Sequence, residues 1–465
     1  MSNDNIRVVV LAAGQGKRMK SSRIKVLHRA GGQALIDYVL DLAGQVSTQK
    51  PIVIIGHDRD AVRAHCGDRA QFAIQERQLG TGHAVLQARP LITSSAAAIL
   101  VLSGDVPLTR LETLEKLVEE HRASANAVTL LSMKLDEPAG YGRVIRSSDG
   151  AVARIVEAKD ATEEEKRVGE VNAGIYVFDA ARLFDDLAAL SSNNAQGEYY
   201  LTDVIGAATK RGERVGAMIA DPIEALGVNS RADLAAVEKE LSRRTIERLM
   251  VAGVTFRNPE STLIDGGVTI GKDTIVYPFV TLEGKTVIGS DCVIFPGSHL
   301  IDVRVGDRVT IKTGTVAEES VIENDASVGP YAHLRAGTVL GAKVKVGNFV
   351  ETKKAVFGKG AKASHLSYIG DADIGEDVNI GAGTITCNYD GVNKNKTILE
   401  DGVFIGSDTQ LVAPVRVGKG AYVGAGSTIT KDVPPDALAL SRSPQKIIEG
   451  WAARRRGEIA EKKKK

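Results

Sequence analysis

Aliphatic residues recur every six positions from Ile270 almost to the end of the chain, and this repeat constrains the fold more than any other feature. Gly often follows the aliphatic residue directly, as in Ile270-Gly271 and Val417-Gly418. A six-residue period is typical of a parallel β-helix, in which each hexad is one short strand plus a tight turn and three hexads complete a triangular coil. We expect the aliphatic residue to point into the prism and Gly to allow the turn. The repeating residues are Ile270, Val276, Leu282, Ile288, Ile294 and Leu300, then Ile322, Val328, Leu334, Leu340 and Val346, and finally Leu399, Ile405, Leu411, Val417, Val423 and Ile429.

The first half of the chain has a different pattern. Residues 6–11 (IRVVVL), 51–55 (PIVII) and 98–102 (AILVL) are short apolar runs typical of buried parallel strands. Residues 111–119 have helical spacing, and 127–132 form a later strand. Alternation of strand and helix predicts an α/β domain with a mostly parallel sheet. Ligands bind at the carboxyl ends of such strands, here after Leu11, around Gly104-Asp105 and near Asn229.

Bulk composition excludes several classes of protein. A formal net charge of +1 does not favour nucleic-acid binding, and hydrophobic residues at 43% are enough for sizeable cores. The three cysteines are far apart, so no disulfide framework or CxxC metal site is expected and a reducing cytoplasm is favoured. The sequence has neither an apolar run of transmembrane length nor a signal-peptide pattern at its start. The basic tail is expected to be solvated and mobile.

Candidate phosphate-binding groups follow the predicted strands of the first half. In residues 11–19 (LAAGQGKRM) two glycines let backbone N–H groups approach phosphate oxygens, and Arg18 and Lys25 add positive charge. The G-x-G-x-R spacing is neither the P-loop nor the dinucleotide fingerprint, so a simple strand–helix turn is the alternative. Amides and backbone groups of residues 75–84 (QERQLGTGHA) can recognise a base edge. Asp105 stands where a Mg²⁺ ligand would sit, although Asp after a strand is also a common helix cap.

A second set of unusual polar residues lies where the hexad register slips, at residues 348–368 and 387–397. Insertions in a solenoid become loops on one face, often the binding face. His365 lies in the first slip and Lys394 in the second. A lone His is often structural, and a Lys pair is often a solvated edge. Cys387 is a rival nucleophile, but nothing identifies a base for it, and a small residue filling a turn is the alternative.

The motifs LAAGQGKRM, QLGTGHA, GDVPL, GYGR and NAQGEYYLTD resemble sugar-1-phosphate nucleotidyltransferases. Together with HLSYIGDA and NIGAGTITCNYDG in the repeat region, they resemble the bacterial bifunctional N-acetylglucosamine-1-phosphate uridyltransferase/glucosamine-1-phosphate acetyltransferases over all but about the last dozen residues. Two positions depart from the commonest pattern: Lys17 stands where Thr is frequent, and Ile24 where Pro often precedes the lysine. Lys17 would alter the local charge, but neither change removes a group that the chemistry requires.

The resemblance implies roles for residues of the first half, with Mg²⁺ as cofactor. Asp105 and Asn229 would hold the metal, and Asn229 would also border the nucleotide and sugar. The remaining residues would bind UTP on its phosphate side (Leu11, Ala12, Gly14, Arg18 and Lys25), uracil (Gln75, Gly80 and Thr81) and the amino sugar (Gly140, Glu157 and Asn172).

The resemblance also implies an acetyltransferase site in the repeat region. His365 would be the general base that removes a proton from the amino sugar as it attacks the thioester. The other residues would clamp the sugar phosphate (Arg335 and Lys353), hold the ring (Tyr368 and Asn379), contact the sugar or thioester through backbone N–H groups (Ala382) and bind acetyl-CoA (Asn388, Tyr389, Ser407, Ala425 and Arg442), with Lys394 assisting. Lys394 is implied to serve an adjacent subunit, because relatives with this architecture are trimers.

The predicted fold is a Rossmann-like α/β nucleotidyltransferase domain followed by a left-handed parallel β-helix. The expected divisions are residues 1–229 for the first domain, 230–252 for a linker helix, 253–453 for the β-helix and 454–465 for the tail. The predicted function is a cytoplasmic enzyme that acetylates glucosamine 1-phosphate and then makes UDP-N-acetylglucosamine, a cell-wall precursor, from UTP, without nucleic acid or membrane insertion. The alternatives are a monofunctional nucleotidyltransferase with a structural β-helix and a sugar-binding or scaffold protein without catalysis.

Overall fold

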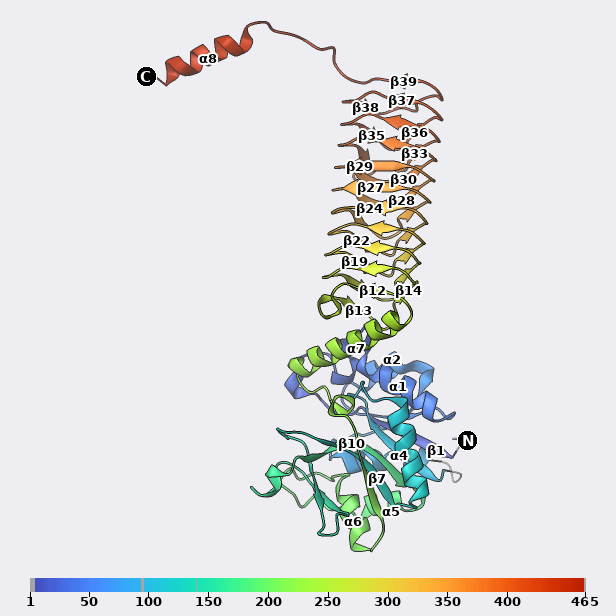
Figure 1. Ribbon diagram of the computed structural model, residues 1–465, viewed down its shortest axis with the longest axis vertical. Helices are drawn as coiled ribbons and strands as arrows, with labels where there is room; N and C mark the ends of the chain where they lie inside the picture. Colours follow the sequence, from blue (N-terminus) through green and yellow to red (C-terminus); the bar gives the residue numbers. More distant parts are fainter. Residues whose placement is uncertain (1–4, 93–95, 139, 464–465) are drawn as a thin grey trace. The chain divides into compact units, whose positions relative to one another are not determined.

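The computed structural model describes residues 5–92, 96–138 and 140–463, and the chain divides into two compact units between Thr245 and Ile246 (Figure 1). Within the described residues, no helix combines the length and apolar character needed to span a bilayer. The α-helices are α1 (Leu35–Val46), α2 (Arg59–Cys66), α3 (Thr81–Leu86), α4 (Leu111–Ala123), α5 (Ala180–Ala189), α6 (Asp203–Lys210), α7 (Arg231–Val251) and α8 (Trp451–Lys462).

The first unit is built on a mixed sheet with the strand order β11-β7-β10-β6-β1-β4-β5, and a β8–β9 hairpin extends from β10. Alternate residues of the central strands pack into two separate apolar cores, one on each face, as the continuous β-branched runs predicted. The strands are β1 (Ile6–Leu11), β4 (Ile52–Ile55), β5 (Gln71–Ile74), β6 (Ala98–Ser103), β7 (Val128–Lys134), β8 (Arg143–Arg146), β9 (Val152–Val156), β10 (Glu170–Asp179) and β11 (Val215–Ile219), and β2 (Arg29–Ala30) pairs with β3 (Gln33–Ala34) in a small separate hairpin.

Strand direction explains where the first unit presents its polar loops. Strands β1, β4, β5 and β6 are mutually parallel, so the segments after Leu11, Ile74 and Ser103 emerge at one edge of the sheet. Strand β10 instead runs antiparallel to both β6 and β7. The main path of the sheet is therefore mostly parallel, as predicted, with β10 reversed within it because the β8–β9 hairpin turns the chain before β10 and no crossover helix is needed there.

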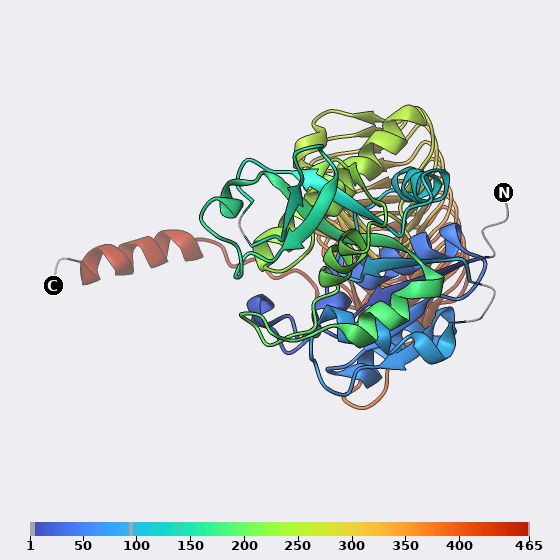
Figure 2. The same cartoon turned by 90° about the horizontal axis from the view of Figure 1, so that it is seen from below.

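The second unit is a parallel β-helix of stacked coils, seen from the side in Figure 1, and successive coils overlap in the view of Figure 2. Ile275 pairs with Val293 and Val293 with Thr310, so successive coils are offset by 18 and 17 residues, close to three hexads. Asn379, however, pairs with Phe404, an offset of 25 residues. The extra residues form the hairpin at residues 388–396, which is the second register slip of the sequence.

The coil strands form two stacks of hydrogen-bonded strands, and every repeating aliphatic residue named above is buried inside them. One stack contains β12 (Thr255–Phe256), β15 (Ile275–Val276), β18 (Val293–Ile294), β21 (Thr310–Ile311), β24 (Ser327–Val328), β27 (Lys345–Asn348), β29 (Lys362–His365), β31 (Asn379–Ile380), β34 (Phe404–Ile405), β37 (Tyr422–Val423) and β39 (Leu438–Ala439). The other contains β13 (Leu263–Ile264), β14 (Thr269–Ile270), β16 (Thr281–Glu283), β17 (Val287–Ile288), β19 (His299–Ile301), β20 (Arg304–Val305), β22 (Val316–Glu318), β23 (Val321–Ile322), β25 (His333–Leu334), β26 (Val339–Leu340), β28 (Glu351–Phe357), β30 (Tyr368–Ile374), β32 (Ile385–Cys387), β33 (Thr397–Leu399), β35 (Gln410–Val412), β36 (Val415–Val417) and β38 (Thr428–Ile429).

The glycine after the aliphatic residue has a different physical reason from the one the sequence suggested. A Cβ on Gly271 would lie 2.6 Å from the backbone nitrogen of Ser290 in the next coil, so Gly is required there by close packing between coils. The left-handed backbone conformation of this turn falls two residues later, at Asp273 with φ of 60°. Asp tolerates that conformation better than most non-Gly residues, so the turn itself does not need Gly.

Candidate functional site

The parallel strands of the first unit surround a pocket of about 360 Å³, within the range of small-molecule sites. It lies at the predicted sheet edge. Its lining residues are Leu11, Ala12, Ala13, Gly14, Lys25, Val26, Gln75, Gln78, Gly80, Thr81, Ala84, Ser103, Asp105 and Glu198.

The glycine-rich turn after β1 packs against Lys25. Gly16 has φ of +62°, and a Cβ there would lie only 2.7 Å from the Lys25 Cβ. Only Gly allows both this conformation and this approach. The turn therefore presents Gly14 to the pocket and positions the lysine beside it.

Lys25 lies between two oxygen ligands at the edge of the pocket. Its ammonium group donates to the Asp105 carboxylate and, over 3.2 Å, to the amide oxygen of Asn229. Asn229 is held by its own backbone N–H, which donates to the Asp233 carboxylate at 2.9 Å. A carboxylate and an amide oxygen converging on one cation form a donor set that suits a hard divalent metal. Among the described residues, no three or more His, Cys, Asp or Glu side chains cluster as metal ligands, so such a metal would need further oxygens from its ligand or water.

The amide side of the pocket is organised by two glutamines. Gln75 is 4% exposed, and its amide nitrogen donates to the carbonyl oxygen of Gly80 at 3.0 Å. The amide of Gln78 donates to the Ala13 carbonyl at 2.6 Å and so joins this segment to the glycine-rich turn. Gly80 has φ of +110°, a conformation that only Gly adopts readily.

The predicted sugar-binding residues are not among the residues that line this pocket. Gly140 is exposed, as is Arg18, which was predicted to bind UTP and is not among the lining residues either. Glu157 accepts a hydrogen bond from Thr202 at 3.1 Å, and burial raises its pKa. The amide of Asn172 donates to the Tyr176 hydroxyl at 2.6 Å. A Glu157 carboxyl with a raised pKa is a candidate for recognising hydroxyl groups.

Sequence reasoning missed several residues of this pocket. Gln78 lies in the amide-rich segment predicted to recognise a base edge, whereas Glu198 lies in the NAQGEYYLTD motif and has no predicted role. Glu198 reaches the pocket because the segment around Tyr199 docks on the 79–82 loop, with the Gly82 N–H donating to the Tyr199 carbonyl at 2.8 Å. Tyr141, of the GYGR motif, lies close enough for burial and the charges of Asp233 and Asp105 to raise its pKa. The signal for these residues was motif membership, because spacing alone does not bring them together.

In the second unit, one edge of the prism carries five of the predicted residues. His365, Ala382, Ser407 and Ala425 each follow by two positions a residue of the aligned inward column, and Arg442 reaches the same edge from the following segment by donating to the Ala425 carbonyl at 2.8 Å. His365 is exposed, and its Nδ1 is 3.1 Å from the amide oxygen of Asn348. Because that oxygen only accepts, Nδ1 carries the proton and Nε2 is left as the basic nitrogen.

A second group of predicted residues forms a charged cluster around Asp371. Lys353 and Asn388 both contact its carboxylate, Lys353 at 3.8 Å. Close contact with Lys353 lowers the pKa of Lys394, so the two ammonium groups lie side by side. Nearby, Arg335 donates to Glu351 at 2.9 Å. Two adjacent like charges are a preformed place for an anion.

The remaining predicted residues lie around this cluster with different surroundings. The Tyr368 ring lies over Gly370, where a Cβ would meet its hydroxyl at 2.5 Å. Asn379 is aligned with Phe404 on a strand face. Tyr389 is 61% exposed in the inserted hairpin, and its hydroxyl donates to the Gly391 carbonyl at 2.5 Å.

An exposed apolar column borders His365. Tyr331, Phe349 and Leu366 are 54%, 56% and 62% exposed. All three have a left-handed backbone, with φ of 52°, 57° and 45°, and the rings of Tyr331 and Phe349 are stacked at 5.8 Å. The three side chains therefore form an exposed apolar column at one turn position of successive coils.

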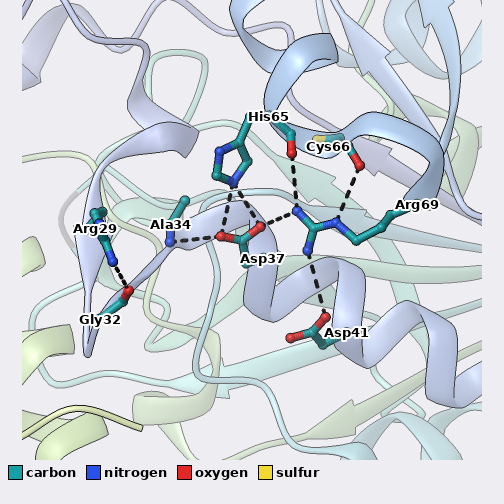
Figure 3. Close-up of polar contacts among 8 residues, drawn as sticks. All are labelled: Arg29, Gly32, Ala34, Asp37, Asp41, His65, Cys66 and Arg69. Atoms are coloured by element: carbon teal, nitrogen blue, oxygen red, sulfur yellow. Dashed lines mark hydrogen bonds and ion pairs between the residues drawn. The ribbon is translucent and has the colours of Figure 1, made fainter. Parts of the chain in front are cut away.

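A further polar cluster in the first unit links α1 to α2 (Figure 3). The Asp37 carboxylate accepts from the Ala34 N–H at 3.0 Å, from Arg69 at 2.5 Å and from His65 at 2.9 Å. Cys66 lies beside it, but burial raises the pKa of its thiol to about 11. The thiol is thus poorly suited to nucleophilic chemistry, and the cluster acts as a helix cap and interhelix link.

Comparison with known proteins covers both units. Residues 7–223 match the family described as "Nucleotidyl transferase", 260–357 match "GMPPB C-terminal domain", and 396–431 match "Bacterial transferase hexapeptide (six repeats)". A protein of Pelobacter propionicus named "Bifunctional protein GlmU" is 50% identical over 97% of this chain and 99% of its own length. Proteins of the same name from Heliobacterium modesticaldum and Fervidobacterium nodosum are each 52% identical, over 96% and 98% of this chain and 98% of their own lengths.

Proposed function

Because this chain belongs to the family of bifunctional GlmU proteins, we propose that each of its two units carries one of two successive transferase reactions. The β-helix acetylates glucosamine 1-phosphate with acetyl-CoA. The first unit then transfers UMP from UTP to N-acetylglucosamine 1-phosphate and releases pyrophosphate. The observation that carries this proposal is that two chemically different polar sites are built on separate units, one around Lys25 and Asp105 and the other around His365. UTP and acetyl-CoA as substrates favour the cytoplasm as the location of the protein. We also propose residues 1–229 as the uridyltransferase domain, 230–252 as the linker helix, 253–453 as the acetyltransferase domain and 454–465 as the tail.

In the uridyl transfer, the work of the first unit is to position groups and balance charge. The sugar phosphate is already anionic, so its oxygen attacks the α-phosphorus of UTP without a strong base. The bond between the α-phosphorus and the α,β-bridging oxygen of UTP breaks, and pyrophosphate leaves with that oxygen. Lys25 and the backbone N–H groups of the glycine-rich turn oppose the charge that develops. Asp105 and Asn229 would hold Mg²⁺, which supplies charge neutralisation at the phosphates when bound.

In the first unit, we assign recognition of the nucleotide and recognition of the sugar to two different sets of residues. Gln75, Gly80 and Thr81 would face the base, and Leu11, Ala12, Gly14 and Arg18 the ribose and phosphates. Gly140, Glu157 and Asn172 would contact the acetylated sugar. Glu157 is the strongest of the sugar candidates, because its half-buried carboxylate has an oxygen to offer a sugar hydroxyl besides the one that Thr202 contacts.

In the acetyl transfer, His365 would act as general base. The amine attacks the thioester carbon, an N–C bond forms, the C–S bond breaks, the amine proton passes to Nε2 of His365, and CoA leaves as the thiol or thiolate. The Asn348 contact supports this role, since it leaves Nε2 free to accept that proton. Arg335, Lys353 and Lys394 would bind the sugar phosphate, whose charge relieves the repulsion between the two lysines.

The other residues of the second unit would hold the remaining parts of the substrates. Tyr368 and Asn379 would border the sugar ring. The Ala382 backbone N–H would polarise the thioester carbonyl or hold the sugar. Acetyl-CoA would lie along the prism edge and the inserted hairpin, contacting Asn388, Tyr389, Ser407, Ala425 and Arg442.

A homotrimer is proposed as the working form. The column of Tyr331, Phe349 and Leu366 supports it, because these exposed side chains adjoin His365 and a second copy would bury them. A prism offers flat walls, so a neighbouring prism would supply the second wall of the acetyl site. Lys394 lies beside Lys353 of its own chain, and in the trimer its hairpin would also serve the adjacent subunit.

The test is a reciprocal pair of variants assayed for both reactions. Asp105→Ala should abolish UMP transfer and keep acetyl transfer, and His365→Ala should reduce acetyl transfer by about 10²–10⁴-fold and keep UMP transfer. Products from glucosamine 1-phosphate, acetyl-CoA, UTP and Mg²⁺ are resolved by mass. Full UMP transfer by Asp105→Ala, or a folded His365→Ala protein with normal acetyl transfer, would contradict the assignment. The monofunctional alternative predicts no acetylated product from the wild-type protein.

A further inference from the structure

We infer that His83 is a specificity-positioning residue for the nucleotide base: it fixes the side-chain amide of Gln75 so that the pocket meets a carbonyl oxygen and not an amide nitrogen. This inference rests on the proposed function, in which the pocket takes UTP. His83 belongs to α3 and is half-buried behind Gln75. It is not among the residues that line the pocket.

Both hydrogens of the Gln75 amide are used inside the protein. One is donated to the carbonyl oxygen of Gly80 at 3.0 Å, and because a carbonyl only accepts, the atom facing it must be the amide nitrogen. The same nitrogen lies 3.1 Å from Nδ1 of His83. Within the described part of the chain, the Gln75 oxygen has no hydrogen-bond partner and is not sealed from solvent, so it is the group left to face the pocket.

The tautomer of His83 follows from its two amide neighbours, Gln75 and Gln87, because only one of them can donate a hydrogen bond to the ring. The amide nitrogen of Gln87 lies 3.3 Å from Nε2 of His83 and donates to the His83 carbonyl at 3.0 Å. Only one ring nitrogen accepts in a neutral imidazole. Gln75 is 4% exposed, so its second hydrogen needs a partner inside the protein, whereas Gln87 is partly exposed and can donate to solvent. Leaving the buried Gln75 hydrogen without an acceptor would cost free energy, so Nδ1 of His83 is the acceptor and Nε2 carries the proton.

Burial lowers the pKa of His83, which keeps the ring neutral and Nδ1 able to accept at neutral pH. A locked Gln75 oxygen suits one kind of base edge. Uracil presents an N–H donor between two carbonyl oxygens, and cytosine presents an acceptor nitrogen at that position. An amide free to rotate would offer either its oxygen or its nitrogen, so the lock excludes the base that needs a donor.

The experiment compares kcat/KM for UTP, CTP and 5-methyl-UTP in the full-length protein. His83→Leu should lower the UTP-to-CTP ratio by about tenfold or more, as expected for one buried hydrogen bond. His83→Asn places an amide oxygen near the Nδ1 position and should restore the ratio. The ratio of UTP to 5-methyl-UTP, which share the same edge, should stay unchanged in both. In a Gln75→Ala background, His83→Leu should change the ratio no further.

Two controls keep the outcomes separate. Acetyl transfer and a thermal melt report on whether each variant is folded. If the wild-type protein forms no UTP-dependent product, that result contradicts the proposed function itself, and the His83 geometry is then tested by a second measurement. That measurement is the ¹⁵N signal of the His83 ring in the wild-type protein, which should show a protonated Nε2 and a bare Nδ1. A proton on Nδ1, or an unchanged UTP-to-CTP ratio in folded His83→Leu, overturns the inference.

Discussion

At the scale of single residues, the proposed sites in both units contain polar atoms that neighbouring side chains hold in place. The Lys25 ammonium satisfies two oxygens that converge at the pocket edge, and the Asn348 oxygen leaves one nitrogen of His365 basic. These contacts define the protonation or orientation of a side chain before any substrate arrives. Preorganisation of this kind lowers the reorganisation needed during the reaction.

Glu157 offers a test of sugar recognition through pH. Burial raises its pKa above the ordinary glutamate value, so the carboxylate takes up a proton earlier than usual as the pH falls. If this carboxylate accepts a sugar hydroxyl, the KM for N-acetylglucosamine 1-phosphate should rise by about tenfold or more between about pH 7 and about pH 5. Steady-state kinetics across this range measure the effect.

The matched control is Glu157→Gln, which cannot ionise. The phosphate of the sugar titrates near pH 6 in both proteins, so only the difference between their pH profiles reports on Glu157. The variant should begin with a raised KM at pH 7 and show the smaller dependence. Parallel profiles for the two proteins would remove Glu157 from the sugar site.

At the scale of secondary-structure elements, turns of the β-helix restrict the sequence at two different positions, one by steric contact and one by backbone conformation. At Gly271, close approach between coils leaves no room for a side chain directly after the aliphatic residue, whereas Glu323 and Glu400 occupy this position in other coils. Left-handed conformation two residues later is met by Asp in several coils and by Gly in others, such as Asp377 with φ of 52° and Gly402 with φ of 66°. Where the coils approach closely the first restriction is steric, and the second is a modest conformational preference.

Substitution of the two kinds of glycine should therefore have different effects on stability. Gly271→Ala places a Cβ 2.6 Å from the Ser290 backbone nitrogen and should lower the unfolding free energy of the second unit by about 1–3 kcal/mol. Gly402→Asp introduces the residue that other coils carry at this turn and meets nothing within 4 Å, so it should have little effect. Thermal and denaturant unfolding compare the two, and equal losses would refute the distinction.

At the scale of the whole molecule, the proposed trimer makes acetyl transfer, but not UMP transfer, depend on the association of subunits. Replacing Phe349, which is 56% exposed, by Asp puts a charge into the apolar column and should prevent burial by a neighbour. We expect Phe349→Asp to lower the molecular mass in solution and to lower acetyl transfer in parallel, with UMP transfer retained. Sedimentation and the two assays on the full-length protein measure this. A monomer with full acetyl transfer would refute the shared site.

The sequence by itself determined the architecture, because both patterns are local. A hexad repeat and apolar runs of fixed length allow few alternatives, and the structure confirms an α/β unit followed by a parallel β-helix. The position of the pocket also followed from a general rule: parallel strands bring their carboxyl ends together, so a site after Leu11 and around Asp105 was predictable. The reversed strand β10 was not, since its direction depends on where a hairpin folds.

Only the tertiary structure decided which polar atoms meet. Glu198 and His83 reach the pocket region through contacts around the 79–82 loop, and Lys353 meets Lys394 because the inserted hairpin returns to its own prism. Hydrogen-bond partners are set by distances of a few tenths of an ångström between residues far apart in sequence, and periodicity carries no information at that precision. The repeat in the sequence predicts the coil, whereas only the packing of one coil on the next explains why its glycines are needed.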